Sequence, residues 1–492
     1  MIQIQLVLQS GLWLLFVLCG GRPGPNRLKC VCRPSTLLRT KEKNRMSTSL
    51  HHTRRDFLRL SGGLTASILA VACVTPGADT GTDDTAGEPA VEKEQILVWD
   101  QFGEDSVGVN EIVVKFNEAH PEYHVTREAQ TNMRDILKTS LDAGAGPDVM
   151  YYDTGPGFAG VLARAGLLLP LDDAYEQYAW NERILPIARE RASFDGVTYG
   201  IGNELEIVGT FYNERIFDEQ GLAAPDTHDD FLAVCEALKA QDIIPMAWGN
   251  QNKWPAGHTF SVFSGNIAGK DNLAAAISGE LAWNEPDFVE SIQIPFVDMV
   301  DAGYYNTDIN AVTYDDSNLL FYSGQAAMRL TGSWMVDGYT NPDNITDPVG
   351  FFFYPSIREK VIAPPAGLGS GYFVGRDAQS PEGAFAYLNF LFSDETIGDW
   401  LEGMAMIPPV RLNADDYSIS DLLRFTIIEI QQNAESMGFN IDVLTPDNYN
   451  TMMFDGFQEV IGKVKTAQEQ ADDLEAAMQE AIERGTVMDI TP

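Results

Sequence analysis

Apolar and polar residues follow a regular pattern through the early globular part of the chain. Residues 96–99, Ile-Leu-Val-Trp, form a short apolar run that predicts a buried strand. Apolar residues at helical spacing follow over 109–116, and Pro121 ends this helix. The same order recurs twice, with strands over 123–128 and 148–152 and helices over 133–141 and 158–165. Three strand–helix units in succession predict an α/β fold with a mostly parallel sheet and helices on both faces.

This pattern also indicates where a ligand would bind. In open α/β sheets, ligands lie beyond the carboxyl ends of the strands, which here are residues 101–104 and 153–157. At the other end of the chain, apolar residues recur at helical spacing over 474–482, and Gly485 ends that helix. We interpret the C-terminal apolar stripe as core packing.

Charge is distributed unevenly along the 492 residues. The chain has a formal net charge of −38, but residues 1–72 hold 11 of the 33 Lys and Arg and only 2 of the 71 Asp and Glu. Residues 73–492 therefore carry a net charge of −47. A body this acidic repels phosphate backbones, so we expect no nucleic-acid partner.

The region before the globular part has the features of an export signal. Arg54 and Arg55 precede a short uncharged stretch over 61–72 and then Cys73, which is typical of a twin-arginine signal peptide (46–72) followed by a lipidated cysteine. The stretch is too short to span a bilayer, which needs about 20 apolar residues. Residues 73–94 are rich in Gly, Asp, Thr and Pro and predict a flexible tether.

Residues 1–45 do not fit this scheme. They hold a second apolar run over 12–18 followed by basic sequence, and two export signals in series have no purpose. We therefore expect translation to begin at Met46. Of the five cysteines, only Cys73 and Cys235 would remain after export, which excludes a disulfide framework and a cysteine-based metal site.

Sequence motifs of common enzymes are missing. There is no phosphate-binding loop, no dinucleotide-binding glycine motif, no His-Glu-x-x-His and no Gly-x-Ser-x-Gly. Acidic doublets such as Asp229-Asp230 place neighbouring side chains in different directions and suit helix N-termini better than a catalytic pair. We expect neither enzymatic activity nor a cofactor or metal.

One long motif resembles a known family. Residues 321–334, Phe-Tyr-Ser-Gly-Gln-Ala-Ala-Met-Arg-Leu-Thr-Gly-Ser-Trp, resemble the signature of family 1 extracellular solute-binding proteins, the maltodextrin-binding-like receptors of ABC importers. Gly146-Pro147-Asp148-Val149 and the segments 199–201 and 211–217 are similar to further parts of the family pattern. Residues 211–214 read Phe-Tyr-Asn-Glu where the family has Tyr-Tyr-Asn-Lys, and residue 228 is His where it has Trp. The resemblance extends over residues 95–484.

The resemblance implies a periplasmic-binding-protein type II fold, with two α/β lobes joined by hinge strands and a ligand cleft between them. We expect the N-terminal lobe to hold 95–208 and 363–400, and the C-terminal lobe 209–362 and 401–492. Sugar sites stack aromatic rings on the C–H faces and supply acids and amides to the hydroxyl groups. The residues expected to bind the ligand are Trp334, Trp254, Tyr152, Asp153, Glu204, Gln101, Glu104, Tyr372 and Phe454.

The expected function is therefore that of a monomeric, lipid-anchored receptor on the outer face of a cytoplasmic membrane. It would capture a sugar or oligosaccharide by hinge closure and deliver it to the permease subunits of an ABC importer. Two alternatives stay open. One is an extracellular carbohydrate-active enzyme such as a glycosidase or lyase. The other is a receptor for a non-sugar solute such as a polyamine, which an acidic site with aromatics would suit.

Overall fold

The protein is described by a computed structural model that covers residues 2–9, 12–19, 93–358, 363–432, 437–488 and 490. The chain divides into two units, 1–86 and 87–492. In the first, β1 (Ile2–Gln9) and β2 (Leu12–Cys19) pair as an antiparallel hairpin. The export-signal residues Arg54, Arg55 and Cys73 and the start at Met46 lie outside the described residues.

The second unit is built on one mixed sheet of nine described strands, with the order β4-β3-β5-β12-β8-β10-β9 and with β11 and β13 at its sides. The three strands expected first, β3, β4 and β5, are parallel neighbours, whereas β12 runs antiparallel to both β5 and β8. The strand bounds are β3 (Glu94–Asp100), β4 (Tyr123–Ala129), β5 (Val149–Asp153), β8 (Gly200–Asn213), β9 (Ile244–Met246), β10 (Ala326–Gly332), β11 (Val349–Phe352), β12 (Pro365–Val374) and β13 (Gly438–Phe439). A separate small hairpin joins β6 (Ser193–Phe194) to β7 (Val197–Thr198).

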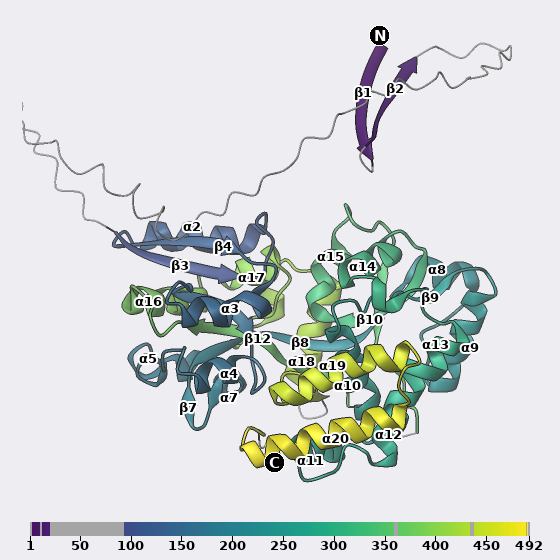
Figure 1. Cartoon of the computed structure of the whole chain (residues 1–492). Coiled ribbons are helices and arrows are strands. Elements are labelled where there is room, and N and C mark those ends of the chain that lie inside the picture. Colours follow the sequence, from purple (N-terminus) through teal and green to yellow (C-terminus); the bar gives the residue numbers. More distant parts are fainter. Residues whose placement is uncertain are drawn as a thin grey trace, which may run out of the picture. The chain divides into compact units, whose positions relative to one another are not determined.

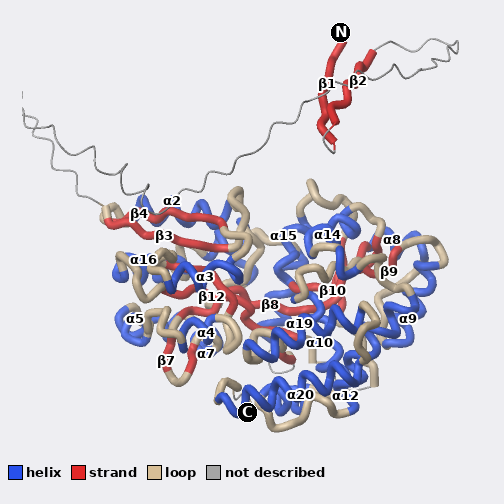
Figure 2. The backbone as a smooth tube through the Cα atoms, viewed as in Figure 1, coloured by secondary structure: helices blue, strands red, loops and turns tan. Residues whose placement is uncertain are grey.

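Strand β8 connects the two halves of this sheet (Figures 1 and 2). Its first part, over 200–207, pairs with β12, and its second part, over 208–213, pairs with β10 and β11. One continuous strand therefore belongs to both halves of the unit.

Helices surround the sheet halves, and several begin and end as the sequence predicts. The helix α2 ends before Pro121, and α20 ends at Gly485, which adopts a left-handed conformation with φ of 66°. The helices of the first half are α2 (Val107–Ala119), α3 (Met133–Asp142), α4 (Ala159–Arg164), α5 (Asp172–Gln177), α6 (Trp180–Arg183), α7 (Pro186–Glu190), α16 (Pro381–Leu391), α17 (Ile397–Gly403) and α18 (Asp421–Gln432).

The second half is richer in helix, and the C-terminal helix α20 packs against α12 and α19. Its helices are α8 (Glu214–Gln220), α9 (His228–Lys239), α10 (Trp254–Ile267), α11 (Lys270–Ile277), α12 (Pro286–Gln293), α13 (Met299–Ala302), α14 (Tyr314–Tyr322), α15 (Val336–Thr340), α19 (Asp447–Ile461) and α20 (Ala467–Arg484). Short helical turns are η1 (Ile294–Asp298), η2 (Ile309–Ala311), η3 (Ser333–Met335) and η4 (Ala414–Asp416). Within the described part of the chain, no helix has both the length and the apolar content needed to cross a bilayer.

Two large apolar cores lie in this unit, and the first extends into both halves, since it also includes Phe321 of α14 and Tyr339 of α15. The first core includes Val98 of β3 and Trp400 of α17, and the second includes Phe260 of α10 and Phe457 of α19. The segment from Leu401 to Ile427 packs in the first core, whereas Ile441 belongs to the second. Because the first core extends into both halves, this packing does not place residues 401–427 in one half, and the boundary at 400 stays a prediction.

Candidate functional site

A large cavity, here called the central cavity, opens where the two halves meet at β8 and β12. Its volume is about 1140 Å³, and its lining comes from the ends of β3 and β5, the start of α3, strands β8 and β12, the start of α10, η3 and residues 440–443. Small-molecule sites usually measure about 300–1,000 Å³. The central cavity is thus large enough for a ligand of several rings.

Two tryptophans and a tyrosine form one wall of the central cavity. The ring centroids of Trp254 and Tyr314 are 4.4 Å apart, and those of Trp254 and Trp334 are 6.1 Å apart with the planes at 64°. The Trp334 Nε1 donates a hydrogen bond of 2.7 Å to the Tyr314 hydroxyl, which lies 2.7 Å from Thr331 Oγ1. All three rings are partly exposed, so they offer apolar faces to a ligand while their polar edges are held in place.

The local sequence explains how these rings reach the cavity. Trp254 is the first residue of α10, and Pro255 follows it. Proline lacks a backbone N–H, which costs nothing here because the first N–H groups of a helix have no partner within the helix. Trp334 follows the end of β10, and its ring folds back over Gly332. A Cβ on Gly332 would lie 1.8 Å from the Trp334 ring. Gly332 is therefore needed for this position of the indole.

Carboxyl groups line another part of the central cavity. Glu204 and Glu206 lie two positions apart on β8, and Asp153 ends β5. The Tyr151 hydroxyl donates a hydrogen bond of 2.9 Å to Glu204 Oε2, and Asn440 Nδ2 donates one of 3.3 Å to Glu206 Oε1. Eight carboxyl side chains line the cavity in all: Asp105, Asp135, Asp153, Glu204, Glu206, Asp315, Asp337 and Asp442.

One arginine faces these acids. Arg134 of α3 donates two hydrogen bonds to Asp153, at 2.7 and 2.9 Å, and its guanidinium lies 4.8 Å from the Phe158 ring centroid. The paired geometry fixes both side chains, because a guanidinium and a carboxylate form two parallel hydrogen bonds. The Asp153 carboxylate therefore lines the cavity in a fixed orientation, with its negative charge balanced by Arg134.

Burial changes the protonation of the remaining groups. It raises the pKa of Glu204 to about 7, against the lowering effect of the Tyr151 hydrogen bond. It also raises the pKa of Asp442 to about 7 and that of Glu206 well above its usual range. Burial and the nearby Arg134 lower the pKa of His258 to about 3, so this imidazole is neutral. At pH 7 Glu206 is therefore protonated, whereas Glu204 and Asp442 are divided between the protonated and ionised forms. A protonated carboxyl group can both donate and accept hydrogen bonds.

The backbone at Glu204 is strained. Its φ is 64°, a left-handed conformation that a non-glycine residue in a strand seldom adopts. The ladder between β8 and β12 is interrupted at this residue, since pairing is present for Asn203 with Ser370 and for Leu205 with Leu368 but not at Glu204. Such strain is concentrated at functional sites, and here it lies on the cavity wall.

Five of the residues predicted from the sequence line the central cavity together. They are Trp334, Trp254, Asp153, Glu204 and Gln101. The cavity also contains residues that the sequence reasoning missed, above all Tyr314, His258, Glu206, Arg134 and Asp442. Tyr314 and His258 had no motif of their own, but His258 lies four residues after Trp254 on α10, a spacing that places both on one helix face.

The other four predicted residues lie outside the lining. Tyr152 points away from the cavity and packs in a cluster with Phe158, because neighbouring residues of a strand face opposite sides, and Tyr151 takes its place. Tyr372 is fully buried in the first core, 5.0 Å from the Tyr151 ring. Glu104 lies on the surface loop after β3 and lines two other pockets there.

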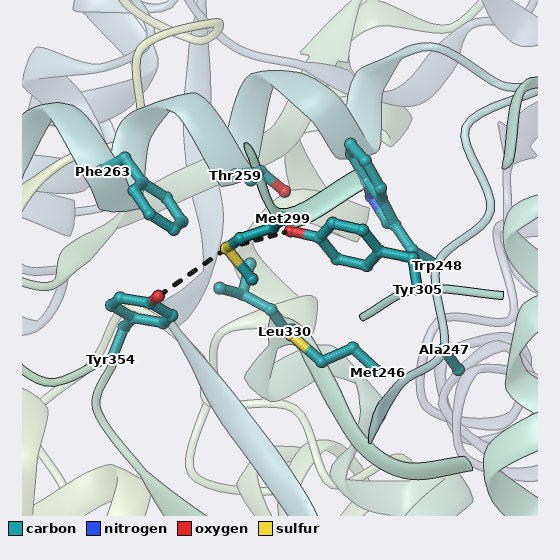
Figure 3. Close-up of a pocket in the computed structure, with 9 residues that line it drawn as sticks. All are labelled: Met246, Ala247, Trp248, Thr259, Phe263, Met299, Tyr305, Leu330 and Tyr354. Atoms are coloured by element: carbon teal, nitrogen blue, oxygen red, sulfur yellow. Dashed lines mark hydrogen bonds between the residues drawn. The ribbon is translucent and has the colours of Figure 1, made fainter. Parts of the chain in front are cut away.

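Phe454 of α19 is partly buried in the second core beside Gly257 of α10. A further buried group in that core, drawn in Figure 3, surrounds Met299, whose sulfur accepts hydrogen bonds from the hydroxyls of Tyr305 and Tyr354 at 3.7 and 3.9 Å. It leaves no room for a water molecule, and it is packing rather than a site. In the described residues, no three His, Cys, Asp or Glu side chains come together as a metal site requires.

Comparisons with known proteins agree with this architecture. Residues 111–422 match the model of the bacterial extracellular solute-binding protein family. The chain is 26% identical over 373 residues to an uncharacterised ABC transporter extracellular-binding protein of Pyrococcus horikoshii, which covers 73% of this chain and 81% of that protein. It is 26% identical over 307 residues to a multiple sugar-binding protein of Streptococcus mutans, covering 60% of this chain and 68% of that protein.

Solved structures are similar in fold. A chitin oligosaccharide binding protein superposes with a TM-score of 0.71 at 24% identity, covering 79% of this chain and 99% of that one. A maltose/maltodextrin-binding domain from Bdellovibrio bacteriovorus bound to maltotriose superposes with a TM-score of 0.65 at 20% identity, covering 79% and 100%. These matches confirm the two-lobed α/β fold that the motifs implied.

Proposed function

Because the chain belongs to the bacterial extracellular solute-binding protein family, we propose that it captures a sugar or an oligosaccharide in the central cavity and delivers it to an ABC permease. The observation that carries this proposal is the pairing of an aromatic wall, Trp254 and Trp334, with a wall of carboxyl groups on β8. Indole faces stack on the C–H faces of a sugar, and protonated or ionised carboxyl groups bind its hydroxyls. The names of the relatives, which include sugar-binding proteins, support the same ligand class.

The experiment is isothermal titration calorimetry with maltotriose, chitotriose and raffinose against the purified protein. We expect one of these or a related oligosaccharide to bind with micromolar affinity, about 8 kcal/mol. Trp334→Ala should weaken that binding about 10- to 30-fold, whereas Phe425→Ala, which removes an exposed ring outside the cavity, should leave it unchanged. Saccharides of all sizes producing no heat and no thermal shift would refute the proposal.

Capture would occur by closure of two lobes about β8 and β12. We assign 95–208 and 363–400 to one lobe and 209–362 and 401–492 to the other. A ligand favours the closed form only through contacts made to both lobes at once. The carboxyl groups on β8 and Trp254 on α10 would provide these contacts.

We also propose that the protein is exported through its twin-arginine signal and anchored by a lipid at Cys73, and that it acts as a monomer. Cys73→Ser should release the protein into the medium or the soluble fraction, which fractionation and immunoblotting would detect. The unchanged melting temperature of the released variant would show that its folding is intact. A Cys73→Ser protein that stays with the membrane would contradict the anchor.

The lining favours one second candidate, an amine-bearing solute. Eight carboxyl groups face the cavity, and Arg134 is the only arginine or lysine in the described lining. A negative cavity concentrates cations. A thermal-shift screen that includes spermidine beside the saccharides separates the two, since a bound ligand raises the melting temperature by mass action.

A further inference from the structure

A second pocket, here called the basic pocket, lies on the same two strands but has a different lining. Its volume is about 570 Å³, within the range of small-molecule sites. Its walls come from α7, β8, β12, β13, the start of α11, and the segment from Val410 to Ile430. Most of its lining is apolar, including Leu185, Ile187, Leu205, Leu412, Met437 and Phe439.

Three cations lie at this pocket in a strongly acidic protein. Arg191 follows the end of α7, Arg411 precedes η4, and Lys270 begins α11 with its Nζ 5.8 Å from the Phe439 ring centroid. Glu206 is the only carboxyl group among the described lining residues, and its Oε1 is already bound by Asn440. The local charge is therefore opposite to that of the chain as a whole, which has 71 Asp and Glu against 33 Lys and Arg.

The two arginines differ from the other arginines of the described region. The described residues include thirteen arginines, and eleven of these form a side-chain hydrogen bond or an ion pair with another described residue. Arg191 and Arg411 form none with the described residues, and both line the basic pocket. Arg191 is also partly buried, and the adjacent Glu190 acts on it only through its charge, without a hydrogen bond or ion pair. A buried guanidinium without a hydrogen-bonded anionic partner is unfavourable.

We propose that the basic pocket binds a small organic anion, a carboxylate carrying an aliphatic or aromatic body. A guanidinium binds a carboxylate through two parallel hydrogen bonds, which supplies the missing partner of Arg191 or Arg411. The body of the ligand would lie against the apolar wall formed by residues such as Leu185 and Phe439. An inorganic anion would leave that wall empty, and a neutral apolar molecule would give Arg191 and Arg411 no carboxylate to bind.

The test is calorimetry of the purified protein with benzoate and hexanoate, compared with benzyl alcohol, hexanol and inorganic phosphate. We expect the two carboxylates to bind at least ten-fold more tightly than their alcohols and than phosphate. Arg411→Gln, at an exposed position, and Arg191→Gln should each weaken carboxylate binding at least five-fold. Arg376→Gln, which removes an exposed arginine outside the pocket, should leave it unchanged.

The remaining outcomes overturn the proposal. Alcohols that bind as tightly as the carboxylates would show a purely apolar pocket, and phosphate that binds equally would show a site for simple anions. Carboxylate binding that survives both arginine variants, or that is lost in Trp334→Ala, would place the anion elsewhere, in the latter case in the central cavity. The absence of carboxylate binding to the folded wild-type protein would also refute it.

Discussion

The Trp334 Nε1 donates a hydrogen bond of 2.7 Å to the Tyr314 hydroxyl. The Tyr314 ring in turn lies 4.4 Å from the ring of Trp254, and its hydroxyl lies 2.7 Å from Thr331 Oγ1. One tyrosine thus holds both tryptophans of the aromatic wall in position. Orienting two rings before the ligand arrives reduces the entropy that binding must overcome.

The first prediction concerns this hydrogen bond. Tyr314→Phe keeps the ring but leaves the Trp334 N–H without its acceptor, at a cost of about 1 kcal/mol. We expect saccharide binding to weaken about 5-fold, because the freed indole must be ordered by the ligand. Calorimetry on Tyr314→Phe, Trp334→Phe and the double variant forms a cycle, and effects that simply add would show that the two residues do not cooperate.

Gly332 gives the second prediction. A methyl group at this position would meet the Trp334 ring at 1.8 Å, so Gly332→Ala must displace the indole. We expect a loss of about 1–3 kcal/mol in unfolding free energy and a loss of saccharide affinity at least as large as that of Trp334→Ala. Gly398→Ala in α17 is the matched control, since its added methyl group meets no atom within 4 Å. Chemical denaturation and calorimetry measure both effects, and a Gly332→Ala protein with normal affinity would contradict the role of this glycine.

The third prediction is a pH dependence of stability. Because burial raises the pKa of Glu204 to about 7, the folded protein holds this proton at a pH where the unfolded chain, with a pKa of about 4.5, has lost it. The stabilisation is complete below the unfolded pKa and disappears as the pH rises through about 7. Between pH 5 and pH 8, we expect the free energy of unfolding, measured with urea, to fall by on the order of 1–3 kcal/mol more in the wild type than in Glu204→Gln. Parallel curves for the two proteins would show that Glu204 is ionised at pH 5.

The fourth prediction concerns Arg134 and Asp153. The Asp153 side chain is 10% exposed, so Arg134→Ala leaves a nearly buried carboxylate without its partner. We expect destabilisation of about 1–3 kcal/mol and weaker binding, whereas the double variant Arg134→Ala with Asp153→Asn should recover part of the stability. Urea unfolding of the single and double variants provides the measurement. A single variant as stable as the wild type would mean that the pair contributes little.

The sequence by itself determined the order of the elements and the class of protein. Periodicity and end signals placed β3, α2, β4, α3 and β5 within a few residues of their observed bounds. These signals are local, because a strand or helix bounded by Pro or Gly depends mainly on its own residues. The Gly-Ser-Trp motif located Trp334 for the same reason, since Gly332 and the indole it accommodates are two residues apart.

Only the tertiary structure decided which side chains face the central cavity. All five residues of β5 are buried, so no alternation of polar and apolar residues distinguished Tyr151 from Tyr152. The sequence-based prediction named Tyr152, whereas Tyr151 lines the cavity. Tyr372 and Phe454 likewise have the right residue type but pack in the cores. Tyr314, Arg134 and Asp442 reach the cavity from segments far apart in the chain. Their meeting depends on how β8 and β12 bring the halves of the sheet together, which no local pattern encodes.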